Sequence, residues 1–427
     1  MNILLCTKIF QKYYPPSREA WARVFFQLMR FGFCFYILFF PIGIALREIG
    51  AIISLAGLIP YYILDYNNSN LKRFKLKWIY FLFFAFLIFK MFHSIDIETS
   101  WYGIRTNLHK AFILIFVGME FVRGLKDLKI LVTLFAIMGC YEGLDGVYQY
   151  FSGTDLIKGT KIMGGRLTGS LSTFRVGNLM SLVLPISLAL FILLPDKWSK
   201  FKKLILTSLV LAPGIFLLLE AKARSGYVGF FTACVALIFL FKGFSWRKTL
   251  AFCAILVWAL FFGPERTSFQ QILNDGRIKE LWPFGIEVFK HYPLLGVGIN
   301  GYNPGFRSLG LVPKYHSLGI PHPHNIYIQF ACETGIVGLS LLLFFFSAYL
   351  TWSLKRIRKG LQTKQKNYWI ITSFFWSSFL GYTATAFSAH NFFRTWWLGM
   401  AFSILGILIG ACIGRSEEVK KIKEYKK

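Results

Sequence analysis

Acidic residues are scarce in this sequence. Only 20 of its 427 residues are Asp or Glu, and charged residues of both signs together make up 16% of the chain. A soluble domain carries about 25% charged residues. With a hydrophobic content of 55%, this composition excludes an ordinary soluble domain and indicates a chain that lies largely in lipid.

Cysteines are few and scattered, and flexible linkers are missing. The seven cysteines form no CxxC pair, and most of them fall inside apolar runs. Such cysteines behave as small apolar packing residues, which argues against a disulfide framework and against a zinc site. No stretch rich in Pro, Gly or Ser divides the chain. We therefore expect a single membrane domain over residues 1–427.

Long apolar runs are the dominant feature of the sequence. Runs of about 15–23 residues recur between Val24 and Ile413, separated by short charged links. A run of this length matches the ~30 Å hydrocarbon core of a bilayer. The sequence thus predicts an all-α polytopic membrane protein with about twelve transmembrane helices. The spans are expected at 24–46, 49–64, 76–92, 110–122, 130–150, 174–194, 204–220, 226–241, 249–263, 326–354, 368–388 and 391–413.

The net charge of +28 follows the predicted topology. Alternate links hold 30 of the 48 Lys and Arg residues, although the opposite set contains the longest link. These basic segments are 1–23, 65–77, 123–129, 195–203, 242–248, 355–366 and 414–427. Basic residues in short loops stay in the cytoplasm. Both termini are therefore expected there, with 414–427 as a basic cytoplasmic tail, and we expect membrane lipids and no nucleic acid as partners of this charge.

The longest link, 264–325, is expected on the outer side before the tenth span. Connectors of this length are usually functional or disordered, and this one carries many aromatic residues. Part of it has apolar residues at helical spacing, with a proline, Pro283, that predicts a kink or a new helix start. The expected apolar face comprises Ile278, Leu281, Trp282, Ile286 and Phe289. An interfacial helix on lipid and a lid over a cavity both fit this pattern.

Two arginines stand out in the outward links. Arg224, in Glu220-Ala-Lys-Ala-Arg-Ser-Gly226, joins two spans almost without a loop, so it must lie near the bilayer surface. A snorkelling arginine explains this position, and so does a phosphate ligand, because guanidinium offers a fixed fork of donors and stays charged. Arg277 opens the amphipathic helix and, taken alone, is an ordinary surface arginine.

A third outward motif, Pro321-His-Pro-His-Asn325, precedes the tenth span. Asn325 is expected to cap that helix through its side-chain oxygen. The positive end of the helix dipole disfavours imidazolium at His324, and a neutral imidazole can act as a general base. His322 is the second candidate. The HxH pair could instead bind a metal, but no nearby carboxylate or cysteine cluster completes such a site.

These motifs together resemble the O-antigen ligase and O-antigen polymerase family. The matching segments are Ala-Arg-Ser-Gly-Tyr-Val-Gly at 223–229, Arg277 with Trp282, Pro-Leu-Leu-Gly-Val-Gly at 293–298, His-Pro-His-Asn at 322–325 with the following Gln, Glu-Thr-Gly-Ile-Val-Gly-Leu at 333–339, and Asn178 with Pro185. Arg175 departs from the family pattern and receives no role. The order of the motifs, the span number and the long outward loop extend the resemblance over most of the chain.

The resemblance implies a GT-C-like glycosyltransferase in the bacterial inner membrane with a periplasmic active site. It implies an O-antigen ligase that moves a glycan from undecaprenyl diphosphate to a lipid A-core sugar, inverting the anomeric centre without a metal or nucleotide cofactor. Arg224 and Arg277 would hold the diphosphate and His324 would activate the acceptor hydroxyl. This chemistry fits the residues, because the donor brings its own leaving group and fixed arginines can stabilise the departing charge.

Other functions remain open at this stage. An O-antigen polymerase would use the same arginines and histidine, with another lipid-linked glycan as acceptor. A protein O-glycosyltransferase often carries a sizeable outward C-terminal domain, whereas this chain ends in a short basic tail. A small-anion transporter belongs to another class, and it would require ionisable residues deep within spans, for which Glu142 and Asp145 are the best candidates.

Overall fold

Helices account for most of the chain in the computed structural model, which describes residues 17–173, 175–243, 247, 275–314, 320, 322–388 and 391–424. These residues contain no β-strand, only two isolated β-bridges in the loop after residue 153. The all-α prediction is therefore confirmed. The predicted span 249–263, the first part of the long loop at 264–274 and the first sixteen residues lie outside the described residues.

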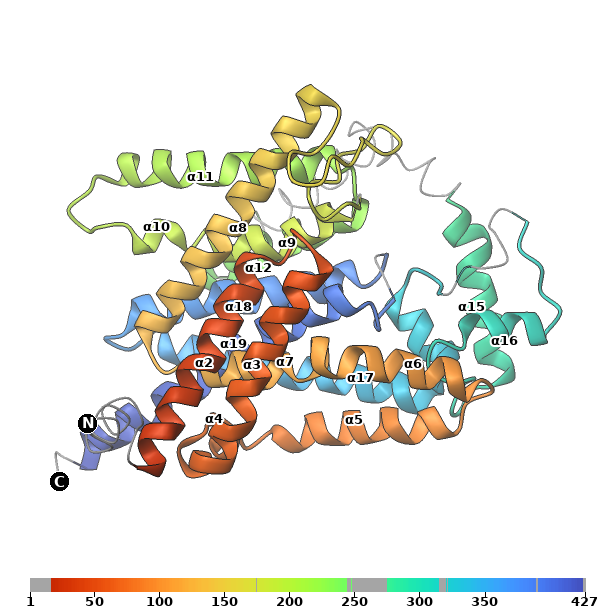
Figure 1. The fold of residues 1–427 in the computed structure, drawn as a ribbon, viewed down its shortest axis with the longest axis horizontal. Coiled ribbons are helices and arrows are strands. Elements are labelled where there is room, and N and C mark those ends of the chain that lie inside the picture. The colour runs from red at the N-terminus through yellow and green to blue at the C-terminus, as the bar shows by residue number, and fades with distance from the viewer. Residues whose placement is uncertain are drawn as a thin grey trace, which may run out of the picture.

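The helices follow one another in the order shown in Figure 1. They are α2 (Arg18–Leu38), α3 (Ile44–Asp65), η1 (Tyr66–Asn68), α4 (Asn70–Arg73), α5 (Lys77–Phe92), α6 (Ile97–Asn107), η2 (Leu108–Phe112), α7 (Leu114–Phe121), α8 (Leu125–Ser152), α9 (Val176–Ser187), α10 (Leu190–Leu193), α11 (Lys200–Glu220), α12 (Arg224–Lys242), η4 (Arg277–Leu281), α15 (Trp282–His291), α16 (Tyr302–Ser308), α17 (Ile326–Gly360), α18 (Lys366–Thr385) and α19 (Thr395–Glu424). Helix α19 thus continues into the segment that we expected to be a separate tail.

Seven of the described helices are long and apolar enough to cross a membrane. They cover Ile44–Asn68, Leu125–Ser152, Val176–Leu193, Lys200–Glu220, Arg224–Phe241, Ile326–Gly360 and Thr395–Ile413. The helices α2, α5, α7 and α18 coincide with four further predicted spans but are shorter or more polar. The chain is therefore a multi-pass membrane protein, and the count of twelve spans stays a prediction.

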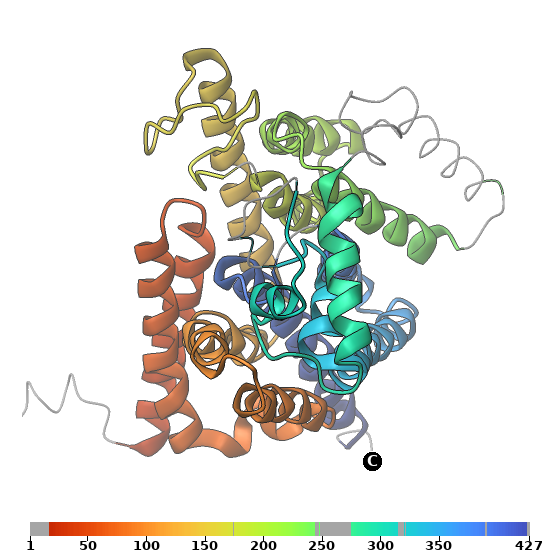
Figure 2. The same ribbon diagram turned by 90° about the vertical axis from the view of Figure 1, so that its right-hand side faces the viewer.

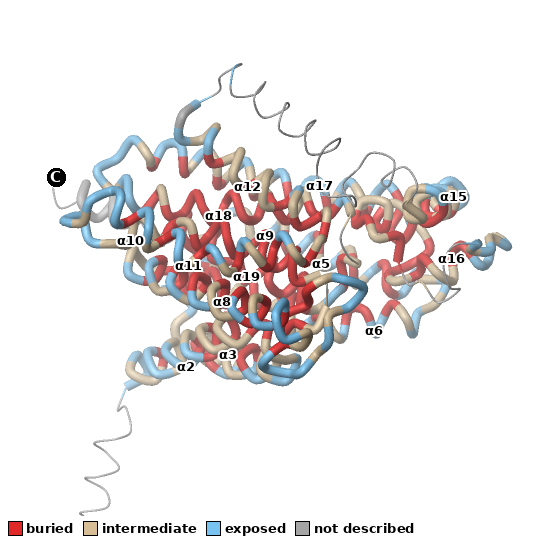
Figure 3. The backbone as a smooth tube through the Cα atoms, turned by 90° about the horizontal axis from the view of Figure 1, so that it is seen from above, coloured by how far each residue is buried: buried red, intermediate tan, exposed pale blue. Residues whose placement is uncertain are grey.

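Three helices, α9, α18 and α19, form the interior of the bundle. Every residue of α9 is buried, and all of the apolar window of α19 is buried as well (Figure 3). Only 28% of the corresponding windows of α11 and α12 is buried inside the protein. A helix that is apolar on all sides needs protein or lipid around it. We infer that α11 and α12 present their apolar side chains outward, as lipid-facing helices do.

The described part of the long loop folds onto the first half of α17. Helices α15 and α16 lie in front of the bundle when it is viewed from that end (Figure 2), and a small core around Val288 and Tyr302 joins them to α17. As expected, a new helix starts next to Pro283, because α15 begins at Trp282 and has this proline in its first turn. The predicted apolar face is wrong in one respect, because Ile286 is 46% exposed whereas Val288 is buried. The π-helical turn η4 precedes α15, and its extra residue per turn shifts the helical register.

The turn at residues 293–298 of the long loop supports a kink in α17. Gly335 has φ 66°, inside what is otherwise one long helix. The segment from Pro293 to Gly298 runs beside this kink, where the Gly298 amide donates to the Glu333 carbonyl (2.8 Å) and the Ile336 amide donates to the Pro293 carbonyl (2.8 Å). A Cβ atom on Gly335 would lie 2.2 Å from a carbonyl oxygen of that segment. Glycine is therefore required here, both by its φ and by the close approach.

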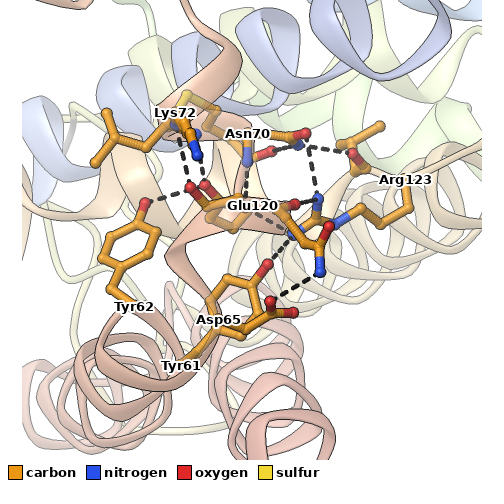
Figure 4. A network of polar contacts seen from close by, with 12 residues as sticks. Tyr61, Tyr62, Asp65, Asn70, Lys72, Glu120 and Arg123 are labelled. Atoms are coloured by element: carbon orange, nitrogen blue, oxygen red, sulfur yellow. Dashed lines mark hydrogen bonds and ion pairs between the residues drawn. The ribbon is translucent and has the colours of Figure 1, made fainter. Parts of the chain in front are cut away.

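A buried carboxylate, Glu120, ties α7 to α4 (Figure 4). Helix α4 lies at the end of the bundle opposite to α15 and α16 (Figure 1). Glu120 accepts hydrogen bonds from the backbone amides of Asn70 (2.9 Å) and Leu71 (2.8 Å) and from the Tyr62 hydroxyl (3.1 Å). Arg123 forms an ion pair with it at 2.7 Å. The carboxylate thus satisfies two amide groups at the start of α4 that the short helix cannot pair itself.

Replacement of Glu120 by Ala is expected to destabilise the folded protein strongly. It would leave two buried amides and the Arg123 guanidinium without their partner, and removing one member of a buried ion pair costs roughly 3–5 kcal/mol. The midpoint of thermal aggregation in detergent measures this loss. Asp65→Ala is the control, because Asp65 accepts one exposed side-chain hydrogen bond, from Asn68. Equal midpoints for the two variants would contradict the assigned role of Glu120.

Candidate functional site

The links that the charge pattern places on the outer side converge on two cavities. The larger has a volume of about 860 Å³ and the smaller a volume of about 70 Å³. Their lining residues come from these links and from the helix ends next to them. The long loop and the link between α18 and α19 contribute to both cavities. Four helices, α9, α12, α17 and α19, begin here, so their N-terminal amides and dipoles add positive potential to the site.

The smaller cavity is strongly cationic. Its basic side chains are Arg166, Arg175, Lys222, Arg224 and Arg277. Among the residues described, one carboxylate lines it, that of Asp275. This carboxylate lies between the two predicted arginines, with Asp275 Oδ2 3.1 Å from Arg224 Nη1 and Asp275 Oδ1 3.9 Å from Arg277 Nε. The structure therefore brings Arg224 and Arg277 to one cavity, as expected from the sequence.

Arg224 is positioned by the close approach of α12 to α9. A Cβ atom on Gly226 would lie 2.6 Å from the carbonyl oxygen of Gly177, so only glycine allows this contact. One residue earlier, the Ser225 hydroxyl donates to Asn178 Oδ1 at 2.9 Å. In the Ala-Arg-Ser-Gly motif, Gly226 thus allows the close helix contact and Ser225 forms the hydrogen bond. Together they fix the start of α12 and the position of Arg224.

Arg277 is held from the opposite side by the link after α18. Its Nη1 donates to the carbonyl oxygen of Ser388 (3.1 Å) and to the hydroxyl of the same residue (3.2 Å). Its backbone amide donates to Asp275 Oδ1 at 2.9 Å. Arg277 opens the π-helical turn η4, and such turns frequently occur at functional sites.

Arg175 is the residue that the sequence analysis left without a role. It lies at the start of α9 and lines the smaller cavity. Its Nη1 atom is out of contact with solvent and has no hydrogen-bond partner among the described residues. Burial, together with the charges of Arg394, Arg277 and Arg166, lowers the pKa of Arg175 to about 10. The guanidinium is still charged at neutral pH, and the three neighbouring arginines add to the lowering of its pKa that burial causes.

The two histidines lie side by side at the edge of the larger cavity. Their ring centroids are 4.2 Å apart, and the backbone amide of His324 donates to Nδ1 of His322 at 3.2 Å. His322 is buried and lines the cavity, whereas His324 is half-buried and is not among the described lining residues. Burial lowers the pKa of His322 well below its ordinary value, helped by the charges of His324 and of nearby arginines. His322 is therefore neutral at pH 7.

The hydrogen bond from His324 also fixes the tautomer of His322. Because Nδ1 of the neutral ring accepts a hydrogen bond from a backbone amide, its Nε2 atom must carry the hydrogen. In this tautomer His322 offers a donor and no free lone pair, so it does not suit the role of a base. Asn325 caps α17 as predicted, since its Oδ1 accepts from the amides of Tyr327 (2.9 Å) and Ile328 (3.1 Å).

Strained backbone gathers in the outward links. In the described part of the chain, four residues other than glycine have positive φ angles, namely Ser172, Lys222, Asn300 and His324. Each such residue costs of order 1–3 kcal/mol, and such strain often accompanies functional sites. Lys222 lines the smaller cavity and Asn300 lines the larger one. No group of three or more His, Cys, Asp or Glu side chains able to hold a metal ion occurs in the residues covered here.

Comparison with known proteins identifies one family. Residues 209–343 match the family model described as O-antigen ligase, a segment that contains Arg224, Arg277 and both histidines but not Arg175. A comparison with curated proteins gives no match. The matched segment spans the long loop and the start of α17, so this part of the chain is similar to the O-antigen ligase family.

Proposed function

We propose that the chain is a polyprenyl-diphosphate-dependent glycosyltransferase of the O-antigen ligase type. In this proposal it moves a glycan from undecaprenyl diphosphate to a lipid A-core sugar on the periplasmic face of the bacterial inner membrane. The family match supports glycan transfer in general. The observation that carries the proposal is the buried Nη1 of Arg175, without a partner among the described residues, in a cavity lined by basic side chains next to two histidines.

A diphosphate suits the smaller cavity better than a single small anion does. Arg224, Arg277 and Arg175 approach it from α12, η4 and α9, so their donors converge on one volume from different directions. Guanidinium groups bind phosphate oxygens in a bidentate way and remain charged in a site of low dielectric. Asp275, which bridges two of these arginines, keeps them aligned and is the group that an incoming phosphate would replace as their partner.

The transfer step needs no further reactant. The acceptor hydroxyl oxygen attacks the anomeric carbon of the donor sugar, and the bond from that carbon to the diphosphate oxygen breaks. The electron pair of this bond leaves with the polyprenyl diphosphate, whose added negative charge the arginines stabilise. The hydroxyl proton passes to His324. Attack opposite to the leaving group inverts the anomeric centre.

The two histidines have different parts in this proposal. His324 acts as the general base, because the hydrogen bond to Nδ1 leaves His322 as a donor only. His322, with a hydrogen on Nε2, donates to an acceptor oxygen and orients it. The positive φ of His324 (58°) holds its ring against that of His322 at some conformational cost.

The alternative of a small-anion transporter loses its main support. Glu142 accepts hydrogen bonds from the Ser170 hydroxyl and from the Leu171 amide (3.2 Å). Asp145 accepts from the Leu156 amide at 2.8 Å. Glu142 and the Oδ1 atom of Asp145 thus anchor the loop between α8 and α9, which is a structural task that does not involve a transported ion.

Deletion of the gene tests the function, with lipopolysaccharide analysed on gels. For a ligase, all capped species are lost and long lipid-linked chains accumulate. For a polymerase, cores that carry a single repeat unit remain. An unchanged lipopolysaccharide profile would refute both forms of the proposal.

Loss of any one of the three arginines is expected to reduce turnover. Replacement of Arg175, Arg224 or Arg277 by Ala removes one fixed donor to the departing diphosphate, which typically lowers kcat by ~10²–10³. Lysine at the same position should restore little, because it lacks the planar fork. The readout is transfer by purified protein from a lipid-linked glycan. Arg105→Ala, an exposed arginine on α6, is the matched control, and full activity of an Ala variant would remove that arginine from the mechanism.

Substitutions at the two histidines are expected to differ in size. His324→Gln removes the base and should lower kcat by ~10²–10⁴. His322→Gln keeps a donor close to the Nε2 position and should cost about tenfold. Both variants must reach the membrane in wild-type amounts, as judged by size-exclusion profiles in detergent. A larger loss for His322→Gln than for His324→Gln would reverse the assigned roles.

A further inference from the structure

The larger cavity has the chemistry of a glycan site with an excess of positive charge. Its volume of about 860 Å³ lies in the upper part of the range for ligand pockets, 300–1,000 Å³. Side-chain amides, hydroxyls and aromatic rings line it together with four basic and two acidic side chains. Tyr102 and Arg307 are exposed, so the cavity is accessible from outside the bundle. Such a polar lining does not suit a polyprenyl chain.

We propose that this cavity binds the acceptor glycan and selects acceptors whose sugars carry negative charge, as phosphate or carboxylate. The inference rests on the proposed function and adds to it a substrate class and a set of specificity residues. Arg47 and Arg307 are assigned to the anionic substituents of the acceptor. Asn300 and Asn391 are assigned to its hydroxyl groups.

The acidic side chains of the cavity are already engaged, and Arg47 has no ion pair with either of them. Glu48 forms an ion pair with Lys110. The carboxylate of Asp96 caps α6, accepting from the Thr99 amide (2.9 Å) and from the Thr99 hydroxyl (2.7 Å). Arg47, by contrast, makes one long hydrogen bond, to the Gly43 carbonyl at 3.3 Å. Its remaining donors are directed to no carboxylate among the described residues.

The amide groups are held in place before any ligand arrives. Asn391 Nδ2 donates to Asn300 Oδ1 at 3.0 Å, and Gln329 Nε2 donates to Asn391 Oδ1 at 2.7 Å. The backbone amide of Asn300 donates to Glu333 Oε2 at 2.9 Å. This network connects the cavity to the buried face of α17. Groups fixed in this way lose little entropy on binding, as recognition of many weakly binding hydroxyls requires.

The position of His322 indicates that the larger cavity holds the acceptor glycan and not the donor glycan. His322 lines the larger cavity and is influenced by the charges of Arg175 and Arg277, which line the smaller one. His322 therefore lies at the larger cavity and within electrostatic range of the arginines of the smaller one. In-line attack brings the acceptor hydroxyl from the side opposite to the leaving diphosphate. With the diphosphate at the arginines, the acceptor has to arrive from the larger cavity.

The test compares acceptors that differ only in charge. The probe is a core glycolipid that carries phosphate and carboxylate, used intact, after phosphatase treatment, and after amidation of its carboxylates. For the wild type, removal of the recognised group should raise KM for the acceptor about tenfold or more, with kcat unchanged. The two treated acceptors show whether phosphate or carboxylate is recognised. An acceptor KM that neither treatment changes would overturn the inference.

Variants then connect the effect to the cavity. Arg47→Gln and Arg307→Gln should each raise KM for the intact acceptor and leave KM for the donor unchanged. The arginine that contacts the recognised group should be identified by a second comparison. Its Gln variant should leave KM unchanged for the acceptor that lacks this group, because the contact is then already absent. Arg105→Gln is the control for loss of one positive charge at this end of the molecule. A rise in donor KM instead would show that the cavity holds the donor glycan and would overturn the inference.

Binding in the absence of transfer separates the two proposals. The probe is the oligosaccharide released from the intact core glycolipid, titrated against protein in detergent by thermophoresis. Charge-dependent binding that Arg47→Gln weakens about tenfold, in a protein without transferase activity, would uphold the cavity and refute the transferase. Transfer with charge-independent binding would uphold the transferase and refute the acceptor selectivity.

Discussion

Repulsion among arginines is the constraint on which the rest of the site depends. Arg166, Arg277 and Arg394 lie close enough to Arg175 to lower its pKa. A single described carboxylate, Asp275, lines the smaller cavity, to which Arg394 does not belong. Like charges in a medium of low dielectric repel strongly. Such an arrangement is stable only if the surrounding packing enforces it, and it becomes favourable when a multiply charged anion binds.

Contacts between helices hold these arginines close together. The glycine contact between Gly177 and Gly226 brings the starts of α9 and α12 together, and the capping residue Asn325 fixes the start of α17. The kink at Gly335 holds the long loop against α17. These contacts lie on one side of the bundle, whereas α9, α18 and α19 provide a rigid buried centre behind them. The arginines of the site therefore lie next to tightly packed helix starts, which prevent them from moving apart.

The two cavities differ in the charge of the side chains that line them, and each therefore suits a different part of the proposed reaction. The smaller one, with its cationic lining, suits a compact, highly charged leaving group, and the larger one, with amides and aromatic rings, suits a glycan. His322 lies at the larger cavity, and the backbone amide of His324 sets which nitrogen of His322 carries a hydrogen. One hydrogen bond thus makes two side chains of the same type chemically different.

The sequence by itself determined the membrane helices, the grouping of the links, the pair Arg224 and Arg277, and the cap at Asn325. Apolar run length, charge bias and capping chemistry are local properties of the chain, so they can be recognised without a fold. Only the tertiary structure decided the place of Arg175, the tautomer of His322, and the burial of Val288 in place of Ile286. Each of these depends on contacts between segments far apart in the chain, or on a π-helical turn that shifts the register, and periodicity carries no information about either.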